Sequence, residues 1–587
     1  MVSLCPPRIF ILCLLSLFLL VPLGRAQTAV SPFVSGAWSG NISPTSATVC
    51  IRLSAAGQRV RLAVSINEQL SSAVFSDTVT TAAAAGNVVT LDISGLQADT
   101  GYFYGIEVGG VLRAESNSRG RFRTFPQGAG SFKIALLGDG DYRDPDHRVY
   151  DAVLAEDPLL LLLNGDLHYS DLNTTNADDY RGAYDNVLRH PVQGRLLRGV
   201  PLAYMWDDHD FAGGNNTNGS AVGAAAARVV YGGYVPHYPL RTGDATIGQA
   251  FTVGRVRIIM TDGRTASVPP TTVESASKTR LGAVQKAWFK QELVSARDAG
   301  FPLIIWLNPT PWIGPATLGE DSWAGYATER TEIANFLKEN RIRNLVIYSG
   351  DLHALAYDDG SHSDYATGGG APLIVMHAAP LTRDPNNKGG PYTAGPFLGT
   401  QQYGILDVTD TGGTTIQCTF SGKRLGEGAK FIFQFSASAA AIEPRVALTL
   451  ATVADRALVN ISARGRINTP TDALTVGFVV AGQRSRNVLI RAVGPSLAAF
   501  GVTDAVPLPM ISLYKGPTLI ASNENWGLLD SARLTAAFDR AGAFRYLSTS
   551  SRDAAMYLSL EPGAYTMQAT STTGVVGSVI VEAYEVP

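Results

Sequence analysis

The chain has 587 residues, of which 45% are hydrophobic and 17% charged, and its formal net charge is −3. This composition is ordinary for packed globular domains and excludes a largely disordered or collagen-like chain. With 4 cysteines and no long Lys/Arg run, the sequence also gives no support to a disulfide-rich scaffold or to nucleic-acid binding. The length corresponds to three or four domains of ~150 residues each.

Residues 1–26 have the pattern of a secretory signal peptide. Arg8 precedes an apolar run over residues 9–21, and small residues stand at the positions that a signal peptidase reads before the cut after Ala26. The apolar run is short for a bilayer span, which disfavours the alternative of a membrane anchor. We therefore expect a Sec-type export signal that is cleaved near Ala26, and a mature chain that is secreted, periplasmic or on the cell surface.

Two cysteines, Cys50 and Cys418, lie beyond the predicted cleavage site. They are far apart in the sequence, and we expect two buried thiols in separate domains. A disulfide between them cannot be deduced from spacing alone. Since the chain has no Cys-x-x-Cys motif, a zinc site built on thiolates is disfavoured.

Residues 31–126 read as short strands separated by frequent turns. The stretches 47–53 and 60–64 alternate between apolar and polar side chains, as half-buried strands do. Leu96 followed by Tyr102 fits a tyrosine corner, in which the tyrosine hydroxyl bonds to the backbone a few residues upstream. This part resembles a fibronectin-III-like or immunoglobulin-like β-sandwich, and the Gly/Pro-rich residues 125–131 follow it as a linker.

Residues 131–435 have a different pattern, in which apolar strands alternate with amphipathic helices. The predicted helices include residues 283–296 and 330–341. The predicted strands are apolar throughout, which is typical of strands covered on both faces. They cover residues 132–137, 159–163, 201–205, 256–260, 302–307 and 344–348. This central region is predicted to be an α/β domain.

Residues 442–587 return to strand-rich sequence after a joint of small residues at 436–441. We expect an all-β sandwich here. The segments 458–465 and 488–495 resemble a C-terminal module that is common in secreted bacterial proteins. Such a module is a candidate for binding the cell surface or another protein.

Four predicted strands of the central region are followed directly by loops that are rich in Asp and His. These loops are residues 138–141, 164–169, 206–210 and 349–353. Each loop alone is a weak signal, because a Gly-Asp pair after a strand is most often a simple turn. In open α/β sheets, however, ligands bind at the carboxyl ends of the strands, and the four loops are therefore expected to meet in space.

The side chains in these loops suit a pair of metal ions. Carboxylates and imidazoles are ligands for iron, zinc, manganese or calcium. So many aspartates in one place would repel one another without cations. A bridging aspartate holds two metals ~3.5–4 Å apart, where they stabilise the attacking and leaving oxygens of a phosphoryl transfer.

Together with two further segments, the loops resemble the alkaline phosphatase D family of calcineurin-like metallophosphoesterases. The pattern Trp-Asp-Asp-His-Asp at 206–210 is distinctive of that family, and Leu-Gly-x-x-Gln-x-x-Trp at 281–288 also matches. So do Asp-x-Trp-x-Gly-Tyr-x-x-x-Arg at 321–330 and Ser-Gly-Asp-x-His at 349–353. The resemblance covers residues 31–435 and implies a central αββα metallophosphoesterase sandwich, which here is flanked by two all-β sandwich domains.

The resemblance also implies roles for individual residues. Asp166 would bridge the metals, and Tyr169 would be a phenolate ligand of a ferric ion. His209, next to Asp208, would stabilise the transition state or protonate the leaving oxygen. The implied metal ligands are Asp139, Asp166, Tyr169, Asp208, Asp351, His353 and Asn308, the catalytic residues are His209 and Asp208, and the substrate contacts are Asn215, His168 and Arg264.

Three of these interpretations leave an alternative open. The family usually has a Cys ligand in the first loop, whereas this chain has Asp139, with Asp141 as the alternative ligand. His168 is either a substrate contact or a surface histidine between two ligands. Arg264 is either a substrate contact or the partner of Asp262 in a structural ion pair.

The carboxylate at position 139 resembles the first motif of purple acid phosphatases, and residues 165–171 resemble their second motif. Replacing a thiolate by a carboxylate hardens the iron site. The family implies Fe³⁺ with Ca²⁺, and Zn²⁺ or Mn²⁺ are the alternatives. The acidic run of Asp171, Asp178 and Asp179 is predicted to be a solvated face.

The sequence thus predicts a secreted, metal-dependent phosphoesterase, either a phosphodiesterase or an alkaline phosphatase. In such an enzyme a hydroxide activated by the dinuclear metal centre attacks phosphorus, and the substrate is a small or polymeric phosphate ester. One alternative is a monoesterase similar to purple acid phosphatases. The other is a non-catalytic binding or adhesion protein on a degenerate scaffold, which the presence of Asp166, Asp208 and His353 disfavours.

Overall fold

The computed structural model describes residues 31–586 except residues 242, 449–459, 481–484 and 529–530. The predicted signal peptide lies outside the described residues. Among the helices of the described ranges, none combines the length and apolar character that a membrane span requires. The short 3₁₀ segments are η1 (Ala83–Ala85), η2 (Ser116–Ser118), η3 (Trp323–Tyr326), η4 (Pro495–Phe500) and η5 (Trp526–Leu528).

The N-terminal region packs two antiparallel sheets against each other. One contains β1 (Trp38–Gly40), β2 (Ser46–Arg52) and β6 (Val88–Ser94). The other contains β3 (Arg59–Ser65), β4 (Val74–Phe75), β5 (Val79–Thr80), β7 (Gly101–Val108), β8 (Val111–Leu112) and β9 (Arg119–Arg123). The Tyr102 hydroxyl accepts a 3.0 Å hydrogen bond from the backbone N–H of Gln97. This bond confirms the predicted tyrosine corner.

The central region begins with a sheet whose middle strands are parallel. They are β10 (Phe132–Leu137), β11 (Leu160–Asn164) and β12 (Leu202–Met205). On the β10 side the sheet continues with the antiparallel strands β20 (Gln402–Thr409), β21 (Thr415–Arg424), β22 (Gly428–Ser438) and β23 (Ile442–Leu448). The apolar runs that we read as buried strands thus form the centre of the sheet.

This sheet also includes the N-terminal region. β1 pairs in parallel with β12 at Gly40 and Leu202, so that the sheet runs through β1, β2 and β6 and contains 10 strands. A Cβ atom on Gly40 would lie 2.7 Å from the Leu202 carbonyl oxygen, and therefore only glycine permits this approach. The buried Trp38 donates from its indole to the Tyr234 carbonyl at 3.0 Å. The two regions that we predicted as separate domains therefore share one sheet and one core.

A second sheet faces the first across that core, where Leu136, Ile258 and Ile305 belong to one apolar cluster. Its 7 strands lie in the order β13-β14-β15-β16-β18-β17-β19. They are β13 (Gln249–Val253), β14 (Val256–Met260), β15 (Leu303–Asn308), β16 (Leu345–Ser349), β17 (Ala354–Asp358), β18 (Ile374–His377) and β19 (Ala394–Leu398). In β15 the side chains alternate, since Ile304 and Trp306 belong to a different cluster on the outer face.

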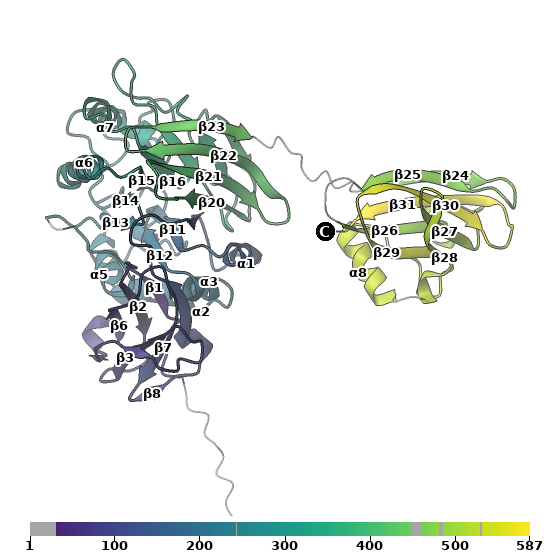
Figure 1. The fold of residues 1–587 in the computed structure, drawn as a ribbon, viewed down its shortest axis with the longest axis horizontal. Coiled ribbons are helices and arrows are strands. Elements are labelled where there is room, and N and C mark those ends of the chain that lie inside the picture. Colours follow the sequence, from purple (N-terminus) through teal and green to yellow (C-terminus); the bar gives the residue numbers. More distant parts are fainter. Residues whose placement is uncertain (1–30, 242, 449–459, 481–484, 529–530, 587) are drawn as a thin grey trace, which may run out of the picture.

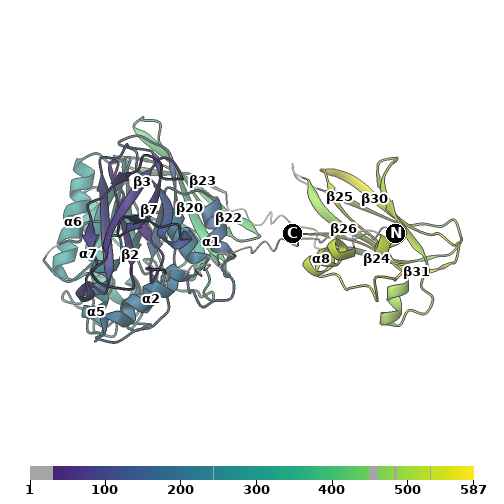
Figure 2. The same ribbon diagram turned by 90° about the horizontal axis from the view of Figure 1, so that it is seen from below.

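Helices cover the outer faces of the two sheets. α6 (Ala283–Asp298) and α7 (Ala327–Glu339) pack Phe289 and Ile333 onto the second sheet, and Figure 2 shows them side by side on one flank. α1 (Arg148–Ala155), α2 (Ala177–Arg189), α3 (Gln193–Gly199) and α5 (Ala224–Tyr234) pack around the first sheet. The one-turn helix α4 (Asp208–Phe211) follows β12. The central region is therefore built as helix, sheet, sheet and helix layers.

The C-terminal region has two antiparallel sheets of 4 strands each around its own core, which includes Ile490, Leu513 and Met567. The first contains β24 (Ile461–Ile467), β31 (Gly577–Glu585), β26 (Arg486–Val493) and β29 (Ala554–Leu560). The second contains β25 (Leu474–Val480), β30 (Gly563–Ser571), β27 (Pro509–Lys515) and β28 (Thr518–Asn523). The helix α8 (Ser531–Ala541), which we did not predict, packs on β26 and β29.

The predicted joint at residues 436–441 is instead a turn between two paired strands. β22 continues to Ser438, and β23 pairs back onto it, with Ala437 opposite Ile442. Small residues suit this tight reversal as well as they suit a linker, and the sequence pattern did not distinguish the two. Residues 442–448 therefore belong to the central sheet and not to the C-terminal region.

Cys50 and Cys418 are free and buried, as expected. They do not lie in separate domains, because β2 and β21 belong to the same 10-stranded sheet. Six strand spacings of ~4.8 Å separate the two strands, and this rules out a disulfide between the thiols.

Candidate metal centre

The acidic loops leave their strands with the same backbone geometry. Asp139, Asp166 and Asp351 each lie two residues beyond the end of β10, β11 or β16, and their φ angles are 54°, 54° and 56°. His353 has a φ of 55°. A left-handed conformation costs a residue other than glycine ~1–3 kcal/mol, and such residues cluster at functional sites. The repeated turn brings these side chains together at the carboxyl ends of the parallel strands.

In the part of the chain that the structure describes, three groups of side chains have ligand atoms close enough together to hold a metal ion, and these groups share members. Within each group the ligand atoms lie within 4.8 Å of one another. The groups are Asp139, Asp166 and His353; Asp166, Asp208 and His209; and Asp207, Asp208 and Asp351. Asp166 belongs to the first two groups and Asp208 to the last two. This sharing is what a bridged pair of metal ions requires.

The carboxylates of Asp139 and Asp166 lie in surroundings that favour a cation between them. Within the described residues, both carboxylate oxygens of Asp139 and of Asp166 are buried without a hydrogen-bond partner. Burial raises the pKa of Asp139 to about 6, and burial followed by repulsion from Asp208 raises that of Asp166 well above its usual value. Buried acceptors without partners are costly. Metal ions would satisfy these oxygens, and the donor set therefore fits them.

His353 has its ring orientation fixed from outside the cluster. Its Nδ1 atom lies 2.7 Å from the Asp384 carbonyl oxygen, which can only accept, and Nδ1 must therefore carry the proton. This leaves Nε2 with its lone pair directed at the site, 3.7 Å from Oδ1 of Asp139. Such a partner is typical of histidines that bind metal ions.

Tyr169 lies among the same groups. Its hydroxyl is 3.2 Å from Nε2 of His353, and its ring packs 4.2 Å from the His209 ring. The Arg383 guanidinium lies 4.3 Å from the centre of the Tyr169 ring. Burial and the nearby Asp166 raise the pKa of Tyr169 well above its usual value. A cation bound at the hydroxyl would be needed to deprotonate it to the phenolate near neutral pH.

The structure separates the two candidates for the first-loop ligand. Asp141 accepts hydrogen bonds from the Arg143 guanidinium at 2.7 and 2.9 Å. Although burial opposes it, these bonds hold the pKa of Asp141 below its usual value. Asp139 lies in a metal-ligand group, whereas Asp141 is in none of the three. The geometry therefore favours Asp139.

His209 is held by a residue that we had placed on a solvated face. Its Nδ1 atom lies 2.5 Å from Oδ1 of Asp171, whose side chain is 53% exposed, as expected of a solvated face. The exposure of Asp171 is compatible with the acidic-run interpretation, but its side chain turns back onto His209. The sequence held a signal for this contact, since Asp171 lies only two residues after Tyr169 within the second loop.

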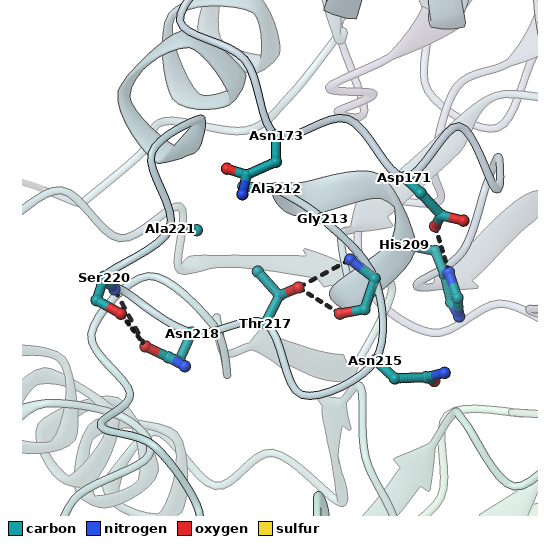
Figure 3. A pocket seen from close by; sticks show the side chains of 11 residues that line it. Asp171, Asn173, His209, Ala212, Gly213, Asn215, Thr217, Asn218, Ser220 and Ala221 are labelled. Atoms are coloured by element: carbon teal, nitrogen blue, oxygen red, sulfur yellow. Dashed lines mark hydrogen bonds and ion pairs between the residues drawn. The ribbon is translucent and has the colours of Figure 1, made fainter.

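A pocket of about 460 Å³ opens beside His209. Figure 3 shows Asn215 and His209 next to each other at one end of it. The lining also includes Asp171, Asn173, Gly213, Gly214, Thr217, Asn218 and Ser220. Asn215, a predicted substrate contact, is thus exposed next to the metal-ligand groups. Besides His209 and Asp171, the pocket offers amides and hydroxyls, and its lining contains neither lysine nor arginine.

Two models of one protein family match the chain. The PhoD-like phosphatase model covers residues 137–389, and the model of the N-terminal domain of PhoD-like phosphatases covers residues 21–126. The chain belongs to the PhoD-like phosphatase family. The matched residues contain the metal-ligand groups together with the β-rich region that shares their sheet.

Comparisons with individual PhoD-like and related proteins give the same picture. Alkaline phosphatase D of Bacillus subtilis (strain 168) is 23% identical over 324 residues, which cover 47% of this chain and 55% of that protein. The chain thus spans little more than half of that relative. A solved structure of PhoD, 18% identical, superposes with a TM-score of 0.57 over 72% of this chain and 93% of that one. It shows a shared fold.

A purple acid phosphatase from yellow lupin (Lupinus luteus) superposes less well. Its TM-score is 0.46 at 11% identity, over 68% of this chain and 73% of that one.

Arg264 does not contact the pocket as we expected of a PhoD-like substrate residue. It is buried, and its Nε atom donates to Asp207 at 2.5 Å while Nη1 donates to Asp321 at 2.7 Å. The Asp262 carboxylate accepts from the Arg264 backbone instead of from its guanidinium. Arg264 is therefore an internal ion-pair residue, with partners that differ from the one we weighed.

His168 is neither a substrate contact nor a surface histidine. It is 1% exposed and packs edge-on against Tyr184 at 5.4 Å. Burial lowers the pKa of His168 to about 4.

Asn308 stands at the end of β15 as predicted, but its amide is already engaged. The carboxamide oxygen accepts from the Trp323 indole at 3.0 Å, and the amide nitrogen donates to the Thr310 carbonyl at 2.6 Å. The side chain is thus oriented by its neighbours, and no contact among the described residues directs it at the ligand groups.

Two further residues organise the centre without having been predicted. Lys388 donates to Oδ1 of Asp351, and although burial opposes it, Asp351 raises the pKa of Lys388. Asp210 accepts from the backbone N–H of Leu167 at 2.9 Å and from that of Asp207 at 2.7 Å. It ties the second loop to the third. Lys388 lies in a polar loop without strand or helix periodicity, and sequence reasoning had no signal for it.

Proposed function

We propose that this chain is an exported, metal-dependent phosphoesterase whose active site is the centre around Asp166 and Asp208. The single observation that carries the proposal is the sharing of these two buried carboxylates between adjacent ligand groups. A binding protein on a degenerate scaffold would have no need to keep them. The family of the chain supports phosphate esters as substrates.

The residues present would hold two ions in different surroundings. Asp139, Asp166, Tyr169 and His353 would hold Fe³⁺, and Asp166, Asp208 and Asp351 would hold Ca²⁺, with Zn²⁺ or Mn²⁺ as alternatives. Such a pair supplies Lewis-acid activation of the attacking water and stabilisation of the charge on the phosphoryl oxygens. Asp207 is less available as a metal ligand, because its Oδ1 atom accepts a hydrogen bond from Arg264.

His209 is the residue of this chain best placed to act on the leaving oxygen. Asp171 fixes its Nδ1 proton, so that Nε2 is free to exchange a proton with the substrate. The side chain of His209 is 15% exposed and lines the pocket of Figure 3. We assign this pocket to the alcohol part of the ester, and Asn215 to a hydrogen bond with the substrate.

A monoesterase similar to purple acid phosphatases is the second candidate. The observation in its favour is the carboxylate of Asp139 at a position where the family usually has a thiolate. The two candidates differ in whether the pocket accepts a second ester group on the phosphate, and relative rates on monoesters and diesters therefore separate them.

The experiment uses the mature chain, purified from residue 27 onwards. Its metal content is measured by mass spectrometry, and hydrolysis of bis-p-nitrophenyl phosphate is compared with that of p-nitrophenyl phosphate. Asp166→Asn should abolish both activities, whereas Asp179→Asn, the same change on the surface, should leave them intact. Protein that binds no metal and hydrolyses neither ester would refute the proposal. Export is tested separately, by locating the cleaved chain outside the cytoplasm.

A further inference from the structure

A row of arginines lies where the N-terminal region meets the central region. In β9, Arg119, Arg121 and Arg123 alternate with Gly120 and the buried Phe122. Side chains two positions apart in a strand share a face, ~6.6 Å from one another along the strand. The three arginines therefore point away from the sandwich core, on the face that α3 approaches.

α3 supplies a second row opposite the first. Arg195 and Arg198 are three residues apart and therefore neighbours on one helix face. A pocket of about 390 Å³ has Arg119, Arg121, Arg195 and Arg198 in its lining, with Glu68 as its only acid.

A second pocket, of about 340 Å³, continues from the first and contains Arg121, Arg123 and Lys133 with the acid Asp157. The two pockets share Phe103, Arg121 and Gly199, and they therefore form one groove. We call it the arginine groove, defined by Arg119, Arg121, Arg123, Lys133, Arg195 and Arg198.

Acids on the rim neutralise part of the charge of the groove. Asp157 lies 3.2 Å from Arg121, and Asp99 lies 2.7 Å from Arg123. Arg195 pairs with Asp151 in the same way. All three pairs are solvent-exposed, so that each is worth little and can open for another anion.

Two arginines have no such partner. Among the described residues, neither Arg119 nor Arg198 forms an ion pair with a carboxylate. Burial lowers the pKa of Arg198, which is the direction expected for a cation that is desolvated without a counter-charge. A concave surface with a surplus of positive charge attracts anionic ligands. The groove would do so although the chain as a whole has a net charge of −3.

The arginine groove is separate from the metal centre. Lys133, Leu159 and Pro201 stand at the amino ends of β10, β11 and β12, whereas the ligand groups stand at the carboxyl ends. The five residues of β11 alone span ~17 Å. A phosphate in the groove is thus out of reach of the metal ligands, and the groove is no subsite of that centre.

We propose that the arginine groove is a second binding site, for a linear polyanion that carries repeated phosphate groups. Guanidinium groups bind phosphate oxygens in a bidentate manner, and arginine favours phosphate over solvent more than lysine does. Two facing rows with regular spacing suit a chain of phosphates better than one isolated ion. The site would hold the protein on such a polymer independently of the chemistry at the metal centre.

The test uses the full mature chain and fluorescein-labelled inorganic polyphosphate, with binding followed by fluorescence anisotropy. Arg119→Gln/Arg121→Gln should weaken binding by about tenfold or more, since each lost contact to a charged group removes a charge-assisted hydrogen bond. The matched control Arg466→Gln/Arg545→Gln changes two exposed arginines of the C-terminal region and should bind as the wild type does. Thermal melting verifies that both variants are folded.

A second arm excludes the metal centre as the binding site. The Asp166→Asn variant should bind polyphosphate with the affinity of the wild type, and raising the salt concentration should weaken binding steeply. Orthophosphate should compete only at much higher concentration than polyphosphate. The proposal is overturned if the wild type does not bind polyphosphate, if the groove variant binds as tightly as the wild type, or if Asp166→Asn alone removes binding.

Discussion

Asp171 and His209 form a hydrogen-bonded pair, with Oδ1 of the carboxylate 2.5 Å from Nδ1 of the imidazole. The side chain of Asp171 is 53% exposed and that of His209 is 15% exposed, so that the pair lies at the mouth of the pocket in Figure 3. The carboxylate accepts a hydrogen bond from Nδ1 and orients the ring, so that Nε2 can donate the second proton of the imidazolium to the substrate. This is the positioning that a proton donor to a leaving group needs.

Replacing Asp171 by Asn should therefore slow turnover while substrate binding is retained. We expect kcat on p-nitrophenyl phosphate to fall by ~10–100-fold, because general acid catalysis contributes ~10²–10⁴-fold and the imidazole itself remains. KM and metal content should change little. The exposed Asp179→Asn variant is the control, and an unchanged kcat in Asp171→Asn would show that the pair has no role in the reaction.

Metal content should distinguish a shared ligand from an unshared one. Asp166 belongs to two ligand groups and Asp139 to one. Asp166→Asn should therefore lose both ions, and Asp139→Asn should lose only the ion held with His353. Mass spectrometry of the purified variants gives the stoichiometry, and equal metal loss in the two variants would contradict the bridging role of Asp166.

Tyr169 should give the iron-loaded protein a visible absorption band. Because burial and Asp166 raise the pKa of the phenol, a phenolate at neutral pH would report direct contact with a cation. Tyr169→Phe should remove the band and keep most of the bound iron. A band that persists in Tyr169→Phe would assign the colour to another ligand.

Arg264 should matter more for stability than for substrate binding. Its guanidinium is buried between Asp207 and Asp321, and removing one partner of a buried ion pair costs about 3–5 kcal/mol. We expect Arg264→Gln to lower the free energy of unfolding in urea by that order. Arg545→Gln, at an exposed pair with Asp539, should change it by less than ~1 kcal/mol. A stable Arg264→Gln variant with a raised KM would restore the substrate-contact interpretation.

His377 should make the folded state sensitive to acid. It is fully buried at the end of β18, and burial lowers its pKa from 6.5 to about 3. Below pH 6.5 the unfolded chain therefore binds a proton that the folded chain does not, and stability falls as the pH falls.

The buried His377 alone should lower the free energy of unfolding by ~1.4 kcal/mol per pH unit, or by about 2 kcal/mol between pH 6.5 and 5.0. His377→Leu should remove this component. The comparison of the two proteins in urea at both pH values cancels the other titrating groups, and parallel losses of stability in both would contradict the assignment.

The strands that carry the site were predictable because they are buried on both faces. Uninterrupted apolar runs such as residues 132–137 give a clear pattern, and β10 and β14 have the bounds that the sequence predicted. Three of the four acidic loops could be found because a Gly-Asp pair, at residues 138–139, 165–166 or 350–351, begins within two residues of the end of an apolar run. The coarse layout of the centre thus follows from local patterns alone.

The contacts that orient the ligands could not be predicted in the same way. Arg264 reaches Asp321 across 57 positions and Lys388 reaches Asp351 across 37, and no local spacing encodes such pairs. Likewise, β1 has only three residues, which are too few to show the alternation of apolar and polar side chains that reveals a strand. Its pairing with β12 depends on one glycine, Gly40.

The pairing of β1 with β12 also limits how this protein can be shortened. A chain that started after residue 126 would lose β1, and with it the neighbour of β12, the strand that leads to Asp207 and Asp208. Tyr234 and Tyr238 would lose their bonds to Trp38 and Ile42 as well. The β-rich N-terminal region and the phosphoesterase region therefore form one folding unit, and neither is a detachable accessory of the other.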